Sequence, residues 1–195
     1  MSAARRTCIS ALAALLLAPI VMPAQAATAW TVDRAQSQLT FYPTLAGGEF
    51  AARFEQFAAT IHFDPADLPH SNLLVVVDLL SARTGDADRD TALQGQDFFM
   101  SSRWPQARFS STALKALGGN RYEATGRLTL RDATRDVRLA LRFDPPAAAG
   151  AAASLSGSTT VKRLDFGVGQ GDWRDTKWLA DDVRIAFSLA LHASK

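Results

Sequence analysis

Cysteine is nearly absent from this chain of 195 residues: Cys8 is the only one, and none follows it. The rest of the chain therefore cannot form a disulfide bond or use a thiolate as nucleophile or metal ligand. Histidine is also scarce, and His62, His70 and His192 do not have the spacing of a metal-binding motif. The cysteine and histidine residues thus give no indication of a metal site or of a catalytic nucleophile.

An excess of one charge sign is missing as well. Lys and Arg together number 21, Asp and Glu number 19, and without Arg5 and Arg6 the two counts are equal. Both signs are interspersed along the chain. Because such a pattern provides no basic face for phosphate groups, we do not expect nucleic acid as a partner.

Sequence motifs of catalysis and cofactor binding are incomplete. The aspartates of segment 86–97 have the spacing of a calcium loop, but Thr91 stands where that loop needs glycine. The glycines of segment 167–171 lack the lysine and the helix of a phosphate-binding loop. No Gly-x-Ser-x-Gly sequence accompanies the serines. We therefore predict that the protein is not an enzyme and uses neither a metal nor a cofactor.

The one long apolar run lies near the N-terminus. Arg5 and Arg6 precede the apolar residues 9–21, and Ala24-Gln25-Ala26 has the small-x-small pattern of a cleavage site. The run is too short to span a bilayer as a helix. We predict a signal peptide over residues 1–26, cleaved near Ala26, and a single exported domain over residues 27–195 that resides in the periplasm.

Alternation of apolar and polar residues dominates the remaining sequence. The clearest case is a hairpin whose strands, 122–130 and 137–143, flank a polar turn. In segment 49–64 the alternation changes phase, so a bulge near Glu55 and Gln56 is needed to keep both sets of apolar residues inward. Together with these three, the predicted strands are 38–42, 108–114, 155–161, 183–191 and 73–80. Segment 73–80 is apolar on nearly both faces apart from Asp78, which fits a strand covered on both sides or a wide apolar surface under the helical segment.

About eight such strands predict an all-β fold, and we expect an eight-stranded antiparallel barrel able to hold one small ligand. A β-sandwich would show much the same alternation. The barrel is favoured by long strands and by small inward residues, which leave room that a filled core would not. These small residues are Ala52, Ala59, Ala124, Gly126 and Gly157.

Segment 81–109 interrupts the strands, after the fourth strand region, and contains one short predicted helix. Asp88 and Asp90 are placed to cap this helix, which extends through Leu93. Four aromatic residues follow within twelve positions, and they either fill the core or line a ligand cavity. They are Phe98, Phe99, Trp104 and Phe109.

Candidate lining residues of such a cavity share an inward position in the alternation. Alternation identifies the inward face without showing whether the space beyond it is filled, so each residue could instead be core. They are Phe41, Phe54, Phe57, Ile61, Phe63, Val75, Val77, Leu79, Phe98, Phe99, Trp104, Phe109, Leu128, Leu139, Leu141, Phe166, Val168, Ile185 and Phe187.

Four charged residues are candidates for holding a polar head group at a barrel rim: Arg83, Asp90, Arg163 and Asp165. The alternative for each is a salt bridge or a helix cap at the rim.

A series of short motifs, in a fixed order, carries a resemblance. They are Trp30-Thr31-x-Asp33, Ser37-x-Leu39-x-Phe41, Phe54-x-x-Phe57, Phe63-Asp64-Pro65, Ser81-x-x-Thr84-Gly85, Arg89-Asp90-x-x-Leu93, Asp97-Phe98-Phe99, Pro105-x-Ala107-x-Phe109-x-Ser111, Tyr122-x-x-x-Gly126-x-Leu128-Thr129-Leu130, Arg163-x-Asp165-Phe166-Gly167 and Asp181-Asp182-Val183. The chain resembles the YceI family of exported, lipocalin-like barrels. That resemblance implies binding of a polyisoprenoid or a similar amphipathic lipid. Segment 167–173 is similar to a subgroup associated with b-type membrane cytochromes, which implies a quinone-type isoprenoid.

The leading hypothesis is therefore a periplasmic binding protein that sequesters or carries a polyisoprenoid or quinone-like lipid in an apolar cavity. The alternative is a filled barrel that contacts a membrane b-type cytochrome through Trp173 and Trp178. An enzyme acting on such a lipid ranks third, because the inward positions contain almost no titratable groups. Candidate partners are the lipid, the cytochrome and, in a homodimer, a second copy of the chain.

Overall fold

A computed structural model describes residues 27–148 and 150–194, so the predicted signal peptide over residues 1–26 lies outside the described residues. The described chain has one α-helix, α1 (Ala87–Gln94), and is otherwise built from strands and short 3₁₀ turns. The strands are β1 (Ala29–Tyr42), β2 (Thr44–Leu45), β3 (Gly48–Glu49), β4 (Ala52–Phe54), β5 (Phe57–His62), β6 (Asn72–Asp78), β7 (Ala82–Arg83), β8 (Gln106–Gly118), β9 (Arg121–Leu130), β10 (Ala133–Asp144), β11 (Ala153–Lys162) and β12 (Asp182–Ala193).

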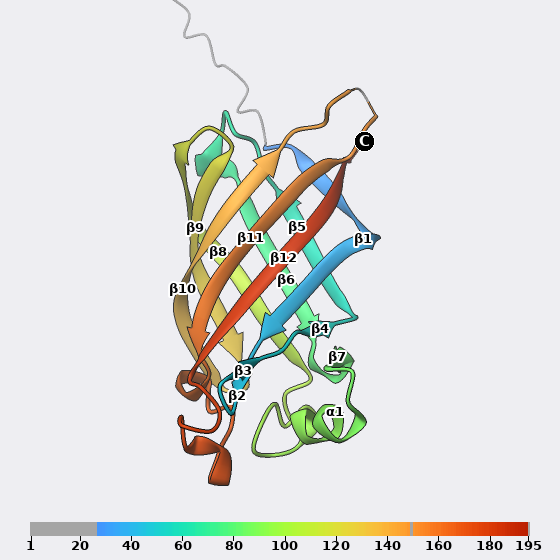
Figure 1. The fold of residues 1–195 in the computed structure, drawn as a ribbon. Helices are drawn as coiled ribbons and strands as arrows, with labels where there is room; N and C mark the ends of the chain where they lie inside the picture. The colour runs from blue at the N-terminus through green and yellow to red at the C-terminus, as the bar shows by residue number, and fades with distance from the viewer. Residues whose placement is uncertain (1–26, 149, 195) are drawn as a thin grey trace, which may run out of the picture.

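The long strands form one antiparallel sheet that closes on itself (Figure 1). Around the barrel the neighbours are β1, β5, β6, β8, β9, β10, β11 and β12, and β12 pairs again with β1. Closure pairs most of the strand edges, although β10 and β11 pair only from Ala140 to Asp144 of β10. The predicted eight-stranded antiparallel barrel is confirmed, and a β-sandwich is not formed.

The predicted strand 49–64 is divided into β3, β4 and β5. The break between β4 and β5 falls at Glu55 and Gln56, where the sequence predicts a bulge. Ser81 stabilises the break, because its carbonyl accepts a hydrogen bond from Glu55 N at 3.1 Å and its hydroxyl accepts one from Gln56 N at 3.0 Å. As a result Phe54 and Phe57, which have opposite parity, both face the barrel interior.

Helix α1 lies beyond the lower end of the barrel in Figure 1. Its predicted caps are wrong. Asp86 is the N-cap and accepts a hydrogen bond from Arg89 N at 2.9 Å, because its backbone is extended and directly precedes the first helical residue. Asp90 lies inside the helix, and its carboxylate accepts hydrogen bonds from the Thr84 backbone and hydroxyl at 2.6 and 2.7 Å.

Aromatic rings pack together inside the opposite end of the barrel. Phe63 is fully buried, and its ring centroid lies 5.0 Å from that of Tyr122 and 4.9 Å from that of Phe143. Trp30 packs edge-on against Phe143 and donates a hydrogen bond to the Phe63 carbonyl at 2.8 Å. We call Trp30, Phe63, Tyr122 and Phe143 the aromatic plug.

The two inward glycines do not leave free space, contrary to the sequence prediction. A Cβ at Gly126 would lie 2.5 Å from the Phe109 ring and 2.6 Å from the Ser110 carbonyl. A Cβ at Gly157 would lie 2.6 Å from the Ala140 carbonyl and 2.7 Å from the Phe187 ring. These glycines are therefore sites where an aromatic ring packs directly on the backbone.

None of the helices in the described part of the chain is long and apolar enough to cross a membrane.

Candidate functional site

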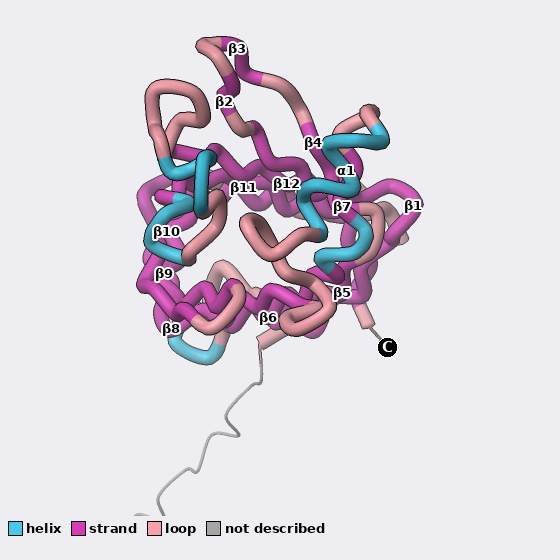
Figure 2. Tube along the Cα trace, turned by 90° about the horizontal axis from the view of Figure 1, so that it is seen from below, coloured by secondary structure: helices cyan, strands magenta, loops and turns pink. Residues whose placement is uncertain are grey.

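An apolar cavity of about 250 Å³ occupies the barrel between the aromatic plug and helix α1. Its lining continues outward to Arg89 of α1 and to Trp173, both of which reach the molecular surface, so the cavity opens at the α1 end. Figure 2 looks into this end, where α1, the β2–β3 hairpin and the turns after β11 surround the opening. We call this opening the mouth.

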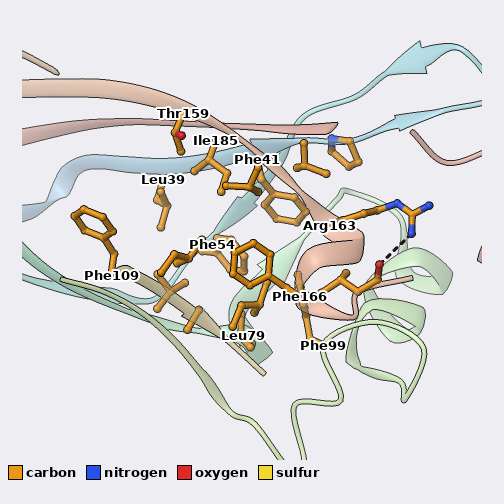
Figure 3. A pocket seen from close by; sticks show the side chains of 18 of the residues that line it. Leu39, Phe41, Phe54, Leu79, Phe99, Phe109, Thr159, Arg163, Phe166 and Ile185 are labelled. Atoms are coloured by element: carbon orange, nitrogen blue, oxygen red, sulfur yellow. Dashed lines mark hydrogen bonds between the residues drawn. The ribbon is translucent and has the colours of Figure 1, made fainter. Parts of the chain in front are cut away.

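The walls of the cavity come from nearly all of the barrel strands. All but three of the apolar residues predicted to line it do so, from β1, β4, β5, β6, β8, β9, β10 and β12 and from the loops at the mouth. Near the mouth, the rings of Phe41 and Phe54 stack with their centroids 4.8 Å apart, and Phe99 lies within 6.3 Å of both (Figure 3). Three distant segments thus supply one aromatic wall.

The three exceptions lie elsewhere in the fold. Phe63 belongs to the aromatic plug, and Leu141, the register partner of Tyr122, is buried beside that plug. Trp104 lies on the rim, stacked with Arg103 and Arg131 at 4.6 and 4.8 Å from its ring centroid. Alternation identified inward positions along the strands, but it does not distinguish the closed end of a barrel from its cavity.

Sequence reasoning missed lining residues of two kinds. Leu39, Ala59 and Val137 lie on inward faces that alternation identifies, so they could have been included. Leu45 and Leu179 lie in mouth segments where no alternation exists. Residues of this second kind are brought to the cavity only by contacts between distant loops.

The mouth loops are tied to one another by backbone hydrogen bonds. Leu45 of β2 forms a bridge with Leu179, and Ala46 N donates to the Trp178 carbonyl at 2.7 Å. Across the opening, the Asp97 carbonyl accepts from Gly169 N and Gln170 N at 2.6 and 2.8 Å. The rim is therefore one connected structure.

Arg163 is a candidate head-group residue that the structure places in another role. It is only 4% exposed, and its stem lines the cavity while its guanidinium points into the loop that follows it. All five N–H donors bind backbone carbonyls at 2.7 to 3.0 Å, and one of these bonds is drawn in Figure 3. The carbonyls belong to Val168, Gly169, Trp173, Leu179 and Ala180.

Burial lowers the pKa of Arg163, and the nearby charge of Asp181 acts in the opposite direction. Asp181 also accepts a hydrogen bond from Leu164 N at 3.0 Å, and its own carbonyl accepts one from Arg163 N at 2.8 Å. The charge of Arg163 is therefore used to hold the mouth loop and is not free to bind a ligand.

The other three charged candidates do not converge on one point of the cavity. Arg83 is exposed and donates to the carbonyls of Leu80 and Ala82, and Asp90 is bound to Thr84. Burial alone would raise the pKa of Asp90, but hydrogen bonds from Thr84 and the charges of Arg83 and Arg89 outweigh it and leave this pKa below its ordinary value. Asp165 lies outside the barrel, in a groove between β10 and β11.

Hydroxyl and charged side chains are scarce in the cavity. Within the described residues only Thr84, Arg89, Thr159 and Arg163 contribute such groups to the lining. Residues 27–148 and 150–194 contain no group of three or more His, Cys, Asp or Glu side chains placed to hold a metal ion. The site is suited to a ligand that is mostly hydrocarbon.

Comparisons with known proteins agree with this architecture. The YceI-like domain family matches residues 30–191. A UPF0312 protein of Ectopseudomonas mendocina is 32% identical over 169 residues, which cover 82% of this chain and 87% of the relative.

Two solved structures are similar. BcnA of Burkholderia cenocepacia is 32% identical with a TM-score of 0.77, covering 82% of this chain and 99% of that one. A polyisoprenoid binding domain from Saccharophagus degradans, implicated in plant cell wall breakdown, has a TM-score of 0.60 over 86% of this chain and 99% of its own. Because it is only 16% identical, that likeness concerns the fold alone. On the family match and the identity to its relatives, this chain belongs to the YceI-like domain family.

Proposed function

We propose that the protein binds an isoprenoid lipid in its barrel and sequesters or carries it. The observation that carries this proposal is the apolar cavity of about 250 Å³, closed at one end by the aromatic plug and open at the other. The Saccharophagus degradans domain, which shares the fold, is itself named for polyisoprenoid binding, so a barrel of this architecture is compatible with this class of ligand.

The physical basis of binding is transfer of hydrocarbon out of water. Burial of apolar surface contributes about 25 cal/mol per Å², so each added isoprene unit strengthens binding while space remains. A wall that is almost entirely apolar leaves few unsatisfied polar groups when water is displaced. An elongated, branched hydrocarbon therefore matches the cavity better than a compact polar metabolite.

Binding without catalysis is the simpler account of the cavity chemistry. Among the described residues, the ionisable side chains of the lining are Arg89 and Arg163, and the donors of Arg163 are all bound to carbonyls. Neither can serve as a general acid or base near neutral pH, because guanidinium groups do not lose their proton in proteins.

Export to the periplasm, a quinone as the ligand and a b-type cytochrome as a partner are further parts of the proposal. Trp178 is 64% exposed and Trp173 is 38% exposed at the mouth, so a partner could contact both rings there. Replacement of Trp178 by alanine should weaken binding to an isolated b-type cytochrome.

Export predicts that the N-terminus of the mature protein is Ala27, which N-terminal sequencing would detect.

Calorimetric titration with isoprenoid alcohols of 10, 15 and 20 carbons tests the proposed function. The expected result is a Kd that falls with each added isoprene unit until the cavity is full. A Kd that is independent of chain length, or no binding by any of the three alcohols, would contradict the proposal.

A further inference from the structure

The barrel wall is incomplete between two strands. β10 and β11 pair over five positions, from Ala140 with Ser158 to Asp144 with Ser154. Toward the mouth the pairing stops, although β10 begins at Ala133 and β11 continues to Lys162. On its other side β10 stays paired with β9 along this length. In Figure 2 the helical turns after β11 lie at the corner between these two strands.

A groove of about 460 Å³ occupies the outer side of this gap. Four of its lining residues, Val137, Thr159, Val161 and Phe166, also line the inner cavity. At this point the groove and the cavity are therefore separated by a single layer of side chains. Phe166, which is 2% exposed, is the largest of the four.

The chemistry of the groove differs from that of the cavity. Its lining contains equal numbers of basic and acidic residues. The basic residues are Arg135, Arg138 and Lys162, and the acidic residues are Glu123, Asp136 and Asp165. Three consecutive hydroxyls, those of Ser158, Thr159 and Thr160, run along β11. A balanced groove lined by hydroxyls suits an uncharged hydroxyl or carbonyl group better than a phosphate.

Thr159 connects the two spaces. It lies on the barrel wall among apolar side chains (Figure 3). Its hydroxyl is one of the few polar groups of the lining, and it takes part in none of the side-chain hydrogen bonds found within residues 27–148 and 150–194. A polar atom of a ligand that reached this point would provide the missing partner.

Two of the polar side chains that line the cavity near the mouth, Thr84 and Arg163, already have hydrogen-bond partners. The Thr84 hydroxyl donates to Asp90 at 2.7 Å, and Arg163 has all its donors on carbonyls. The Arg89 guanidinium lies 4.8 Å from the Phe50 ring centroid and 3.8 Å from the Asp86 carboxylate. Thr84 and Arg163 therefore have no side-chain donor left for the polar end of a ligand, whereas the Thr159 hydroxyl is available to it.

We propose that the gap between β10 and β11 is the site for the polar end of the ligand. This polar end, an uncharged hydroxyl or carbonyl group, passes Phe166 and forms a hydrogen bond with the Thr159 hydroxyl. The proposal rests on the proposed isoprenoid binding and specifies how the ligand is oriented. Passage requires the side chains of Val137, Val161 and Phe166 to shift. No ladder hydrogen bond has to break, because the strands are not paired there.

Farnesol and farnesene share a 15-carbon isoprenoid skeleton and test this assignment, because farnesene lacks the terminal hydroxyl and has one more double bond in its place. Thr159→Val keeps the side-chain shape and removes the hydroxyl, so it should weaken farnesol binding about fivefold and leave farnesene binding unchanged. Thr40→Val, on the outward face of β1, is the matched control and should change neither Kd.

A cross-link across the gap provides an independent test. Arg138→Cys with Thr160→Cys would place two thiols on the outer faces of the unpaired region, and Arg142→Cys with Ser156→Cys would place them where the same strands are paired. Joining the first pair with a short bis-maleimide should weaken farnesol binding relative to the uncross-linked double variant. Joining the control pair should not.

Farnesene separates failure of this assignment from failure of the proposed function. If wild type binds farnesene and farnesol, yet both Thr159→Val and the gap cross-link leave the farnesol Kd unchanged, the groove assignment is wrong and lipid binding stands. If wild type binds neither compound, isoprenoid binding itself is wrong, and the groove assignment falls with it.

Discussion

Arg163 determines the shape of the mouth at the scale of a single residue. A buried guanidinium is costly to desolvate unless its donors are bound, and here five backbone carbonyls at the mouth bind it. Gly169 packs directly against that guanidinium, because a Cβ at this position would overlap Arg163 Nη1. Its φ of +80° also favours glycine.

Gly169→Ala should therefore destabilise the protein by about 2–4 kcal/mol, because both the backbone strain and the loss of Arg163 hydrogen bonds contribute. Gly47→Ala is the control, since Gly47 has a φ of +79° and a Cβ added there would meet nothing within 4 Å. The control should cost only about 1 kcal/mol. Urea denaturation measures both, and equal losses would contradict the role assigned to Arg163.

Asp90 makes stability depend on pH. Its pKa is lowered in the folded protein, so its contribution is present above the pKa of the unfolded chain and is lost as pH falls through the folded value. Asp90→Asn should cost about 1 kcal/mol at pH 7, and the difference from wild type should shrink as the pH is taken well below about 4. Denaturation midpoints at several pH values measure this, and a difference that is constant with pH would exclude an ionic role.

At the scale of elements, the barrel divides into a plug and a cavity wall. Phe63 of the plug is fully buried and does not contact the cavity, whereas Phe54 of β4 lines it. Alternation assigns both to the inward face. Their functional difference arises from their height along the barrel, which alternation does not record.

Phe63→Ala should lower the free energy of unfolding by about 3–5 kcal/mol without changing the lipid Kd of the folded protein, because it leaves the cavity wall intact. Phe54→Ala should cost less stability, since Phe54 is partly exposed, and should weaken lipid binding. Thermal unfolding and calorimetric titration of both variants test this separation. Loss of binding in the folded Phe63→Ala variant would show that the plug contributes to the site.

Strands with a regular pattern of apolar residues could be predicted from the sequence. Features that depend on a contact between particular residues, such as a helix cap or a ring packed on a glycine, could not. Most of the eight strands and the break at Glu55 and Gln56 followed from parity, and β6 followed from a short run that is apolar on both faces. The helix was expected, but its cap was assigned to Asp88 and Asp90, whereas the N-cap is Asp86. The spacing of the aspartates does not show which carboxylate caps the helix and which one binds Thr84. The room expected at Gly126 is filled by Phe109, a contact between neighbouring strands that one strand's pattern does not contain.

At the scale of the whole molecule, the unfilled space within the barrel distinguishes a binding protein from a filled barrel. Ala59 and Ala58 are adjacent on β5, but Ala59 lines the cavity and Ala58 faces outward and is exposed. Ala59→Phe should place a ring in the cavity and reduce lipid binding at least about tenfold, at little cost in stability where space exists. Ala58→Phe adds the same ring outside the barrel and should leave binding unchanged.

Organic extraction of the protein, purified from its native cells without detergent, followed by mass spectrometry of the extract, tests the central claim most directly. We predict a stoichiometric isoprenoid in the extracts of wild type and Ala58→Phe, and a strongly reduced amount from Ala59→Phe. An extract without isoprenoid, from wild type that has also been incubated with isoprenoid-containing vesicles, would contradict the lipid-binding account.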